Sequence, residues 1–141
     1  MNKKLINRIA LLILVIFSLN LLASKFYWYS ALWWFDMPMH FLGGVWLGLA
    51  SVWFYFFGRK HKPMPEINVS RIVKISIISS FVIGFGWEIY EYIVQMLVPA
   101  ANIASPLDSV SDLFFDTAGG AAAAIYLLSQ ISFGENSKSD I

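Results

Sequence analysis

The sequence predicts an all-α membrane protein: a single domain, residues 1–141, folded as a bundle of about four transmembrane helices with both termini in the cytoplasm. Hydrophobic residues make up 58% of the chain and charged residues 13%, whereas soluble domains average roughly 45–50% and 25%. A soluble domain of this length needs many polar residues to cover its surface, and this chain has too few. Lipid is therefore the expected solvent.

The first predicted helix covers about residues 9–23, an apolar run that follows the basic residues Lys3, Lys4 and Arg8. This start is similar to a signal peptide, but the run ends without the small residue expected three positions before a cleavage point, so we expect an uncleaved helix. Residues 26–35 are rich in amphipathic aromatic rings: Tyr27, Trp28, Tyr29, Trp33 and Trp34. Such rings collect at the membrane–water interface, which predicts an interfacial segment over residues 26–35.

Three further spans follow, at about residues 37–57, 72–98 and 106–131. The longest of them can cross a hydrocarbon core of about 30 Å with some tilt, at about 1.5 Å of rise per residue. Between the second and third spans, residues 58–71 are polar and are predicted to form a loop. Residues 132–141 are predicted to form a flexible polar tail.

Small residues predict close contacts between these spans. Gly44 and Gly48 have the spacing that lets two membrane helices approach at backbone distance. Gly84, Gly86 and the run at 119–124 favour the same kind of contact for the third and fourth spans. Short acidic side chains on such helices come within reach of one another.

Charge and cysteine content limit the kinds of site, partner and membrane orientation that this protein can have. The chain has no cysteine, which excludes disulfides and thiolate metal sites, and its net charge of +1 gives no sign of a nucleic-acid partner. With the N-terminus in the cytoplasm, nine of the ten Lys and Arg residues lie at cytoplasmic helix ends, and only Lys25 lies outside. This bias predicts that both termini are cytoplasmic.

Acidic residues stand in three predicted spans where lipid should exclude them. Each span carries a pair on one helical face: Asp36 and His40, Glu88 and Glu91, Asp112 and Asp116. Counted by helical rise from the ends of the third and fourth spans, Glu88 is level with Asp116, and Glu91 is level with Asp112. We therefore predict one polar site between these three helices, in the outer half of the membrane, with Glu88 and Asp116 as close partners.

Carboxylates at this depth need neutralisation. An ionised Asp near the bilayer centre costs about 2.5–3.5 kcal/mol on insertion scales. The carboxylates must share protons or bind cations, because Lys25 is the only basic residue on that side. Oxygen-rich sites with one imidazole suit a divalent cation such as Mg²⁺, Mn²⁺, Ca²⁺, Fe²⁺ or Zn²⁺. The candidate metal ligands are Asp36, His40, Glu88, Glu91, Asp112 and Asp116, of which Glu88, Asp112 and Asp116 are also the candidate catalytic residues.

Two acidic residues have a structural alternative. Asp36 stands where a helix N-cap would satisfy the first free N–H groups of the second span. Asp108 fits the third helical position of a capping box that begins at Ser105. Both interpretations stay open on the sequence alone.

Three segments carry a resemblance to a known family. In VanZ-like membrane proteins one helix begins with an Asp-x-x-x-His motif, which residues 35–41 resemble. Residues 86–91 resemble the Gly-x-x-Glu segment of these proteins. Residues 105–120 resemble their closing Ser-x-x-Asp-x-x-x-Asn-x-x-Gly element. YjdF-type inner-membrane proteins share the same order of acidic residues. Where VanZ-like sequences tend to have Gln and Asn, this chain has Glu91 and either Asp112 or Asp116, and an Arg often found before the last Asp is absent. These departures make the site more acidic.

The resemblance covers about residues 33–125 and leaves out the first helix. It implies a multi-pass protein of a prokaryotic plasma membrane, from a family sometimes linked to glycopeptide resistance and without an established activity. The family name itself therefore assigns no reaction to the acidic residues.

Two functions stay open. The first is that of a metal-dependent enzyme or binding protein for a lipid or lipid-linked envelope substrate. Its cation would hold a phosphate and activate water. The second is a non-catalytic, oligomeric bundle that passes protons or cations or binds an envelope ligand. The first lacks any recognised hydrolase motif, and the second lacks a polar path through the inner half of the spans. The expected partners are membrane lipids, a lipid-linked substrate and further copies of the chain.

Overall fold

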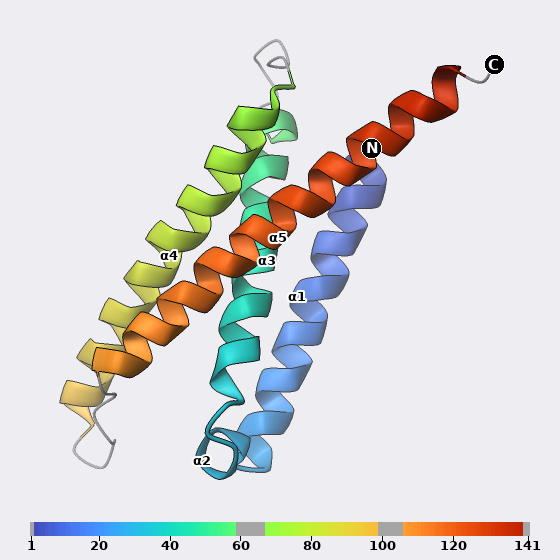
Figure 1. Cartoon of the computed structure of the whole chain (residues 1–141). Helices are drawn as coiled ribbons and strands as arrows, with labels where there is room; N and C mark the ends of the chain where they lie inside the picture. The colour runs from blue at the N-terminus through green and yellow to red at the C-terminus, as the bar shows by residue number, and fades with distance from the viewer. Residues whose placement is uncertain (1, 59–66, 99–105, 140–141) are drawn as a thin grey trace.

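The structure is a computed structural model that describes residues 2–58, 67–98 and 106–139 (Figure 1). This part of the chain is helical and contains no strand; its helices are α1 (Asn2–Lys25), α2 (Trp28–Ala31), α3 (Asp36–Phe57), α4 (Val69–Leu97) and α5 (Pro106–Ser139). The four long helices run alternately up and down, so that the two ends of the chain lie at the same end of the bundle (Figure 1).

The predicted all-α membrane class is confirmed. Within the described residues, three helices are long and apolar enough to cross a membrane: Lys3–Lys25, Asp36–Phe57 and Val69–Leu97. They correspond to the first three predicted spans. The fourth predicted span lies in α5, which carries three Asp residues in its first half, and its place in the membrane remains a prediction.

Helix ends differ from the predicted ones where the sequence pattern is polar. α4 begins at Val69, ahead of the apolar run at 72–98, because the Asn68 side chain accepts a hydrogen bond from the Ser70 N–H at 2.9 Å and so caps the helix. α5 continues through Ser139, although we predicted a flexible tail from residue 132. No proline interrupts that segment, so the backbone can stay helical. Most of the predicted 58–71 loop and Ser105 lie outside the described residues.

The aromatic segment predicted at the interface forms the turn between α1 and α3. Tyr27 adopts a left-handed conformation with φ of 58° and redirects the chain after α1. The rings of Trp28 and Tyr29 then pack edge to face against Phe35, with centroids 5.4 and 5.3 Å apart from it. The packed rings close the end of the bundle opposite the termini.

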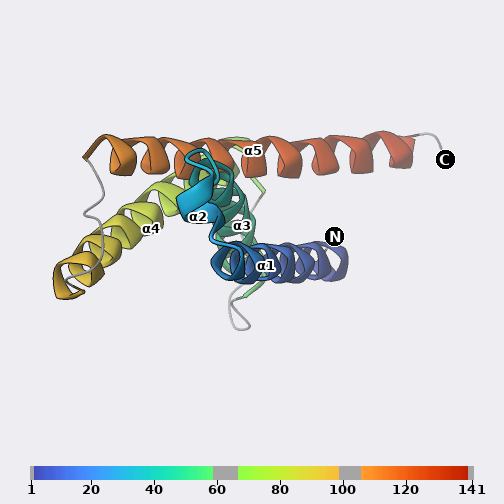
Figure 2. The ribbon, with the colours of Figure 1, turned by 90° about the horizontal axis from the view of Figure 1, so that it is seen from below.

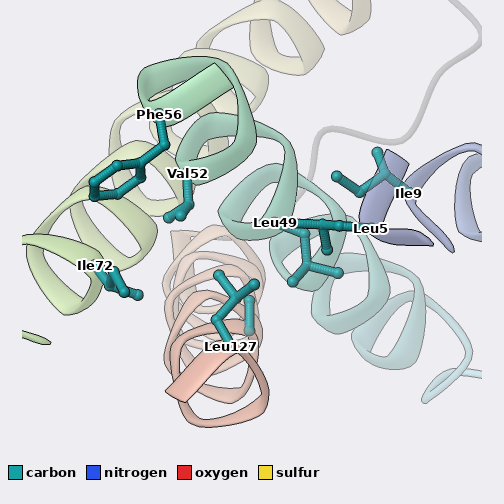
Figure 3. Close-up of a cluster of buried hydrophobic side chains, with 8 residues drawn as sticks. Leu5, Ile9, Leu49, Val52, Phe56, Ile72 and Leu127 are labelled. Atoms are coloured by element: carbon teal, nitrogen blue, oxygen red, sulfur yellow. The ribbon is translucent and has the colours of Figure 1, made fainter. Parts of the chain in front are cut away.

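Helix α3 is the centre of the bundle. α5 lies along one side of α3, while α1 and α4 diverge from each other on the opposite side (Figure 2). Near the termini, the four long helices meet in one apolar cluster (Figure 3), made of Leu5, Ile9, Leu49, Val52, Phe56, Ile72, Ala123 and Leu127. Burial of these side chains fixes that end of the bundle, and the opposite end is free to carry polar groups.

Glycines bring α3 and α5 together at backbone distance, as the spacing of Gly44 and Gly48 predicted. The close contact predicted at Gly86 is wrong, because a Cβ atom there would meet no described atom within 4 Å. A Cβ atom added at Gly44 would lie 2.8 Å from the carbonyl carbon of Asp116, and one added at Gly119 would lie 2.7 Å from the Val45 nitrogen. The fully buried hydroxyls of Ser76 and Ser80 on α4 donate to the carbonyl oxygens of Gly120 and Gly44, at 2.7 and 2.8 Å. Three helices are thus packed closely together between the acidic residues and the end of the bundle that carries the termini.

Helix α1 is attached mainly near its start. The Arg8 guanidinium donates to the Tyr126 hydroxyl and, at 3.1 Å, to the Gln130 side-chain oxygen on α5. The indole N–H of Trp46 on α3 donates to the Ile9 carbonyl oxygen at 3.1 Å. The second half of α1 leaves many apolar side chains exposed, including Leu14 and Phe17. A groove therefore forms beside α3 at the end of the bundle where the predicted site lies.

Candidate cation site

His40 is the centre of the acidic site, and Asp36 contacts it from the preceding turn of α3. The N-cap of α3 is Phe35, which makes no side-chain cap hydrogen bond, so the N-cap alternative for Asp36 is wrong. Instead, the Asp36 Oδ1 atom lies 3.7 Å from His40 Nε2. Residues four apart share a helical face, and this spacing turns the carboxylate toward the ring.

The other ring nitrogen faces α5. His40 Nδ1 lies 3.2 Å from Asp116 Oδ2, and both side chains are buried. The Asp116 side chain reaches the ring because Gly44 and Gly119 let α5 approach α3 so closely. Carboxylates from two helices therefore hold the two sides of one imidazole, which fixes the orientation of the ring.

The remaining predicted residues complete two groups around the same ring. Asp36, His40 and Asp112 offer ligand atoms that all lie within 4.8 Å of one another, and so do His40, Glu88 and Glu91. With the Asp116 contact, the structure brings together all six predicted residues from α3, α4 and α5. We name this set the His40 cluster: Asp36, His40, Glu88, Glu91, Asp112 and Asp116.

Glu88 is a buried carboxyl group with one oxygen that lacks a hydrogen-bond partner among the described residues. It is only 9% exposed, and the oxygen in question is Oε1. Buried polar atoms in folded proteins nearly always have a partner, because an unpaired one loses the hydration of the unfolded state. Glu88 lies against His40 and Glu91. The Oε1 atom, which has no partner in the described part of the chain, therefore indicates that this part of the cluster holds a shared proton or a cation.

The levels of the acidic residues differ from those that we predicted. A Cβ atom added at Gly84 would lie 2.8 Å from Asp116 Cγ. The Asp116 carboxyl group is therefore level with Gly84, one turn of α4 away from Glu88. Counting from helix ends misplaced the pair because α5 is inclined to α4 (Figure 1). Among the described residues, Glu88 and Asp116 are linked through His40, which lies beside both of them.

Two residues near the cluster were not predicted as part of it. The Tyr29 hydroxyl, on α2, donates to the Asn20 side-chain oxygen on α1 at 2.9 Å. Burial raises the pKa of the Tyr29 hydroxyl, and the neighbouring carboxylates of Asp36 and Glu91 raise it further. Tyr29 therefore stays neutral beside the acids. The sequence does contain one sign of this contact: Asn20 is a polar carboxamide inside the apolar run of the first predicted helix.

A cavity of about 770 Å³ opens beside the cluster, between α1 and α4 and over α3. One end is polar and includes Asp36, His40, Glu91 and Asp116, whereas the walls are formed mainly by apolar side chains of α1, α3 and α4. The His40 cluster is thus connected to a space large enough for a small molecule or part of a lipid.

Comparison with known proteins places the chain in a family. Residues 2–132 match a family described as "Predicted membrane protein (DUF2238)". The chain belongs to this family. The DUF2238 match includes every residue of the His40 cluster and also α1, which the resemblance to VanZ-like proteins leaves out. It supports an integral, multi-pass membrane protein, and it does not extend to the VanZ-like or YjdF-type families.

No curated protein and no solved structure matches this DUF2238 chain.

Proposed function

We propose that this DUF2238 protein binds a divalent cation at the His40 cluster, inside the membrane, and acts there on a lipid or lipid-linked substrate. One observation carries the proposal: two groups of possible ligands share His40, and Glu88 beside them has a buried oxygen without a hydrogen-bond partner among the described residues. An isolated ionised carboxylate in lipid is unfavourable, and a cation shared by several carboxylates removes that cost.

The ligand atoms define the chemistry. Carboxylate oxygens favour Mg²⁺, Mn²⁺ and Ca²⁺, and the imidazole extends the range to Fe²⁺ and Zn²⁺. In this proposal Asp36, His40, Glu88 and Asp112 are ligands, and Asp116 orients His40. When bound, the cation polarises a phosphoryl or carbonyl oxygen and lowers the pKa of a bound water. The resemblance to VanZ-like proteins supports an envelope substrate at the plasma membrane of a prokaryote.

A proton or cation pathway is the second candidate. The contacts of both His40 nitrogens with carboxylates favour it, because such an imidazole can pass a proton from one carboxylate to the other. A pathway must continue toward the termini, where Ser76 and Ser80 donate to backbone carbonyls and glycines bring the helices into contact. This packing favours binding at the cluster over conduction through it.

We also propose that α5 is a fourth span and that both termini are cytoplasmic. α5 buries Asp112 and Asp116 but exposes the apolar side chains of Val110, Phe114 and Ile125. An apolar outer face with acidic residues directed to the bundle interior is what lipid requires. The excess of Lys and Arg at the end that carries the termini supports the orientation.

The orientation predicts the accessibility of single cysteines, which can be introduced cleanly because the chain has none. In intact cells, cysteines at positions 62 and 137 are expected to be protected from an impermeant thiol reagent, and a cysteine at position 102 is expected to react. All three should react after permeabilisation. Labelling of positions 62 and 137 in intact cells, with position 102 protected, would invert the orientation.

The cation site predicts coupled effects of Glu88→Gln and Asp112→Asn on thermal stability in detergent. A cation at about 100 times its Kd stabilises the folded state by about 2.7 kcal/mol, which we expect to see as a Tm rise of several degrees for the unaltered protein. Each single variant should lose most of this rise, and the double variant should lose little more, because the residues act on one shared ion. Without cation, Glu88→Gln should be at least as stable as the parent.

The matched control is Glu135→Gln, which removes a carboxylate near the far end of α5. It should leave the cation response unchanged. Additive losses in the double variant, or no Tm response to Mg²⁺, Mn²⁺, Ca²⁺ or Zn²⁺ in the parent, would contradict a shared cation.

A further inference from the structure

The cavity beside the His40 cluster is a groove that opens sideways. Its walls come from α1 and α4, which diverge from each other beside α3 (Figure 2). They include Leu14 and Phe17 on one side and Ile83 on the other. Leu14 is 61% exposed and Phe17 58% exposed. In a membrane these side chains face lipid, so a lipid chain can enter the groove from the bilayer. The volume of about 770 Å³ lies inside the range of roughly 300–1,000 Å³ that ligand pockets span.

The polar end of the groove favours a positively charged ligand. Three carboxylates, those of Asp36, Glu91 and Asp116, line it together with His40, and no Lys or Arg is among the described residues that line it. Behind them, Glu88 contributes a further buried oxygen without a hydrogen-bond partner in the described part of the chain. A ligand with an anionic head group would add repulsion to this end, whereas an ammonium group would relieve it.

Aromatic rings at the same end suit an ammonium group specifically. Tyr29 and Trp87 line the groove beside Asp36 and Glu91, and Trp46 lines it farther along α3. A ring face attracts a cation through its quadrupole, and this attraction grows where water is excluded. A primary ammonium also offers three N–H donors to the surrounding carboxylate oxygens.

We propose that the groove between α1 and α4 binds one chain of a membrane lipid whose head group carries a primary ammonium, with that ammonium among Asp36, Glu91 and Asp116. This assignment goes beyond the cation site: it shares Asp36 with the proposed cation ligands but requires no bound cation. Glu88 and Asp112 belong to the possible cation ligands but do not line the groove. The head group therefore meets a different side of the cluster from these two carboxylates.

The test is native mass spectrometry of the purified full chain, released from detergent micelles that contain equal amounts of phosphatidylethanolamine and phosphatidylglycerol with matched acyl chains, in EDTA. We expect one lipid per chain, with phosphatidylethanolamine retained about tenfold over phosphatidylglycerol. The combined substitution Asp36→Asn with Glu91→Gln should remove this preference. Gly43→Leu should abolish retention of both lipids, because Gly43 lines the groove and a Cβ there meets nothing closer than 3.9 Å, so a longer side chain can fill the space.

Gly86→Leu is the matched control, since a Cβ at Gly86 meets no described atom within 4 Å and Gly86 is not among the groove-lining residues. It should retain the lipid preference. Equal retention of the two lipids, or retention unchanged by Gly43→Leu, would overturn the assignment. A preference for phosphatidylglycerol that appears when Mn²⁺ replaces EDTA would also overturn it, in favour of an anionic head group bridged by the metal. Metal content measured on the same samples separates these outcomes from a failure of the cation site.

Discussion

Replacing His40 with alanine is expected to remove the response of this protein to divalent cations altogether. His40 is the residue shared by both groups of possible ligands, and its two ring nitrogens face Asp36 and Asp116. Loss of the imidazole removes a ligand and also leaves the buried Asp116 carboxylate without its partner. Removing one member of a buried charged pair costs about 3–5 kcal/mol, so the variant should also unfold at a lower temperature without cation.

Two further variants separate these effects. His40→Gln keeps a hydrogen-bond donor near the carboxylates, so it should recover part of the basal stability while still failing to respond to cation. His61→Ala, which removes the other histidine of the chain, should behave as the parent. A normal Tm rise with Mn²⁺ or Zn²⁺ in His40→Gln would show that the imidazole is not a ligand.

Alanine at Gly44 or Gly119 is expected to destabilise the bundle, whereas alanine at Gly86 is not. At Gly44 the new methyl group would collide with the Asp116 backbone, and at Gly119 with the backbone of α3. Backbone atoms cannot move aside as a flexible side chain does, and overpacking typically costs about 1–3 kcal/mol. At Gly86 no described atom lies within 4 Å of the added Cβ, and alanine gains up to about 1 kcal/mol of helix propensity.

Thermal unfolding of the three variants in one detergent checks this contrast. The collision at Gly44 also displaces Asp116 relative to His40, so Gly44→Ala should weaken the Tm response to cation more than Gly86→Ala does. Equal stability of Gly44→Ala, Gly119→Ala and Gly86→Ala would mean that α3 and α5 are farther apart than in this structure.

Most of the fold could be predicted because lipid imposes a simple pattern on sequence. The apolar runs of α1, α3 and α4 are long enough to identify directly, and the spacing of Gly44 and Gly48 indicated a close helix contact, which the structure shows with α5. Helix ends were harder to predict where polar residues continue the helix. Asn68 caps α4 through a hydrogen bond that length and hydropathy do not reveal, and nothing in the composition shows that α5 continues through Ser139.

The six residues of the His40 cluster were also predictable, because a carboxylate in an apolar span is unfavourable unless it faces a polar site inside the bundle. The arrangement of these six residues in space could not be predicted. Helical spacing placed Asp36 and His40 on one face, but the contact of His40 with Asp116 depends on how α5 crosses α3. The inclination of α5 likewise sets Asp116 level with Gly84 rather than Glu88. The groove and the place of Asn20 beside it could not be predicted, because they depend on how far α1 and α4 diverge from each other beside α3 (Figure 2).

The most direct test of the proposed cation site is pulsed electron paramagnetic resonance of Mn²⁺ bound to the purified protein in lipid nanodiscs. A Mn²⁺ ion at the His40 cluster should bind once per chain and show modulation from the ¹⁴N nucleus of one coordinated imidazole. That modulation should vanish in His40→Gln and persist in His61→Ala. A bound Mn²⁺ whose spectrum lacks nitrogen modulation, or keeps it in His40→Gln, would contradict a cation site built around His40.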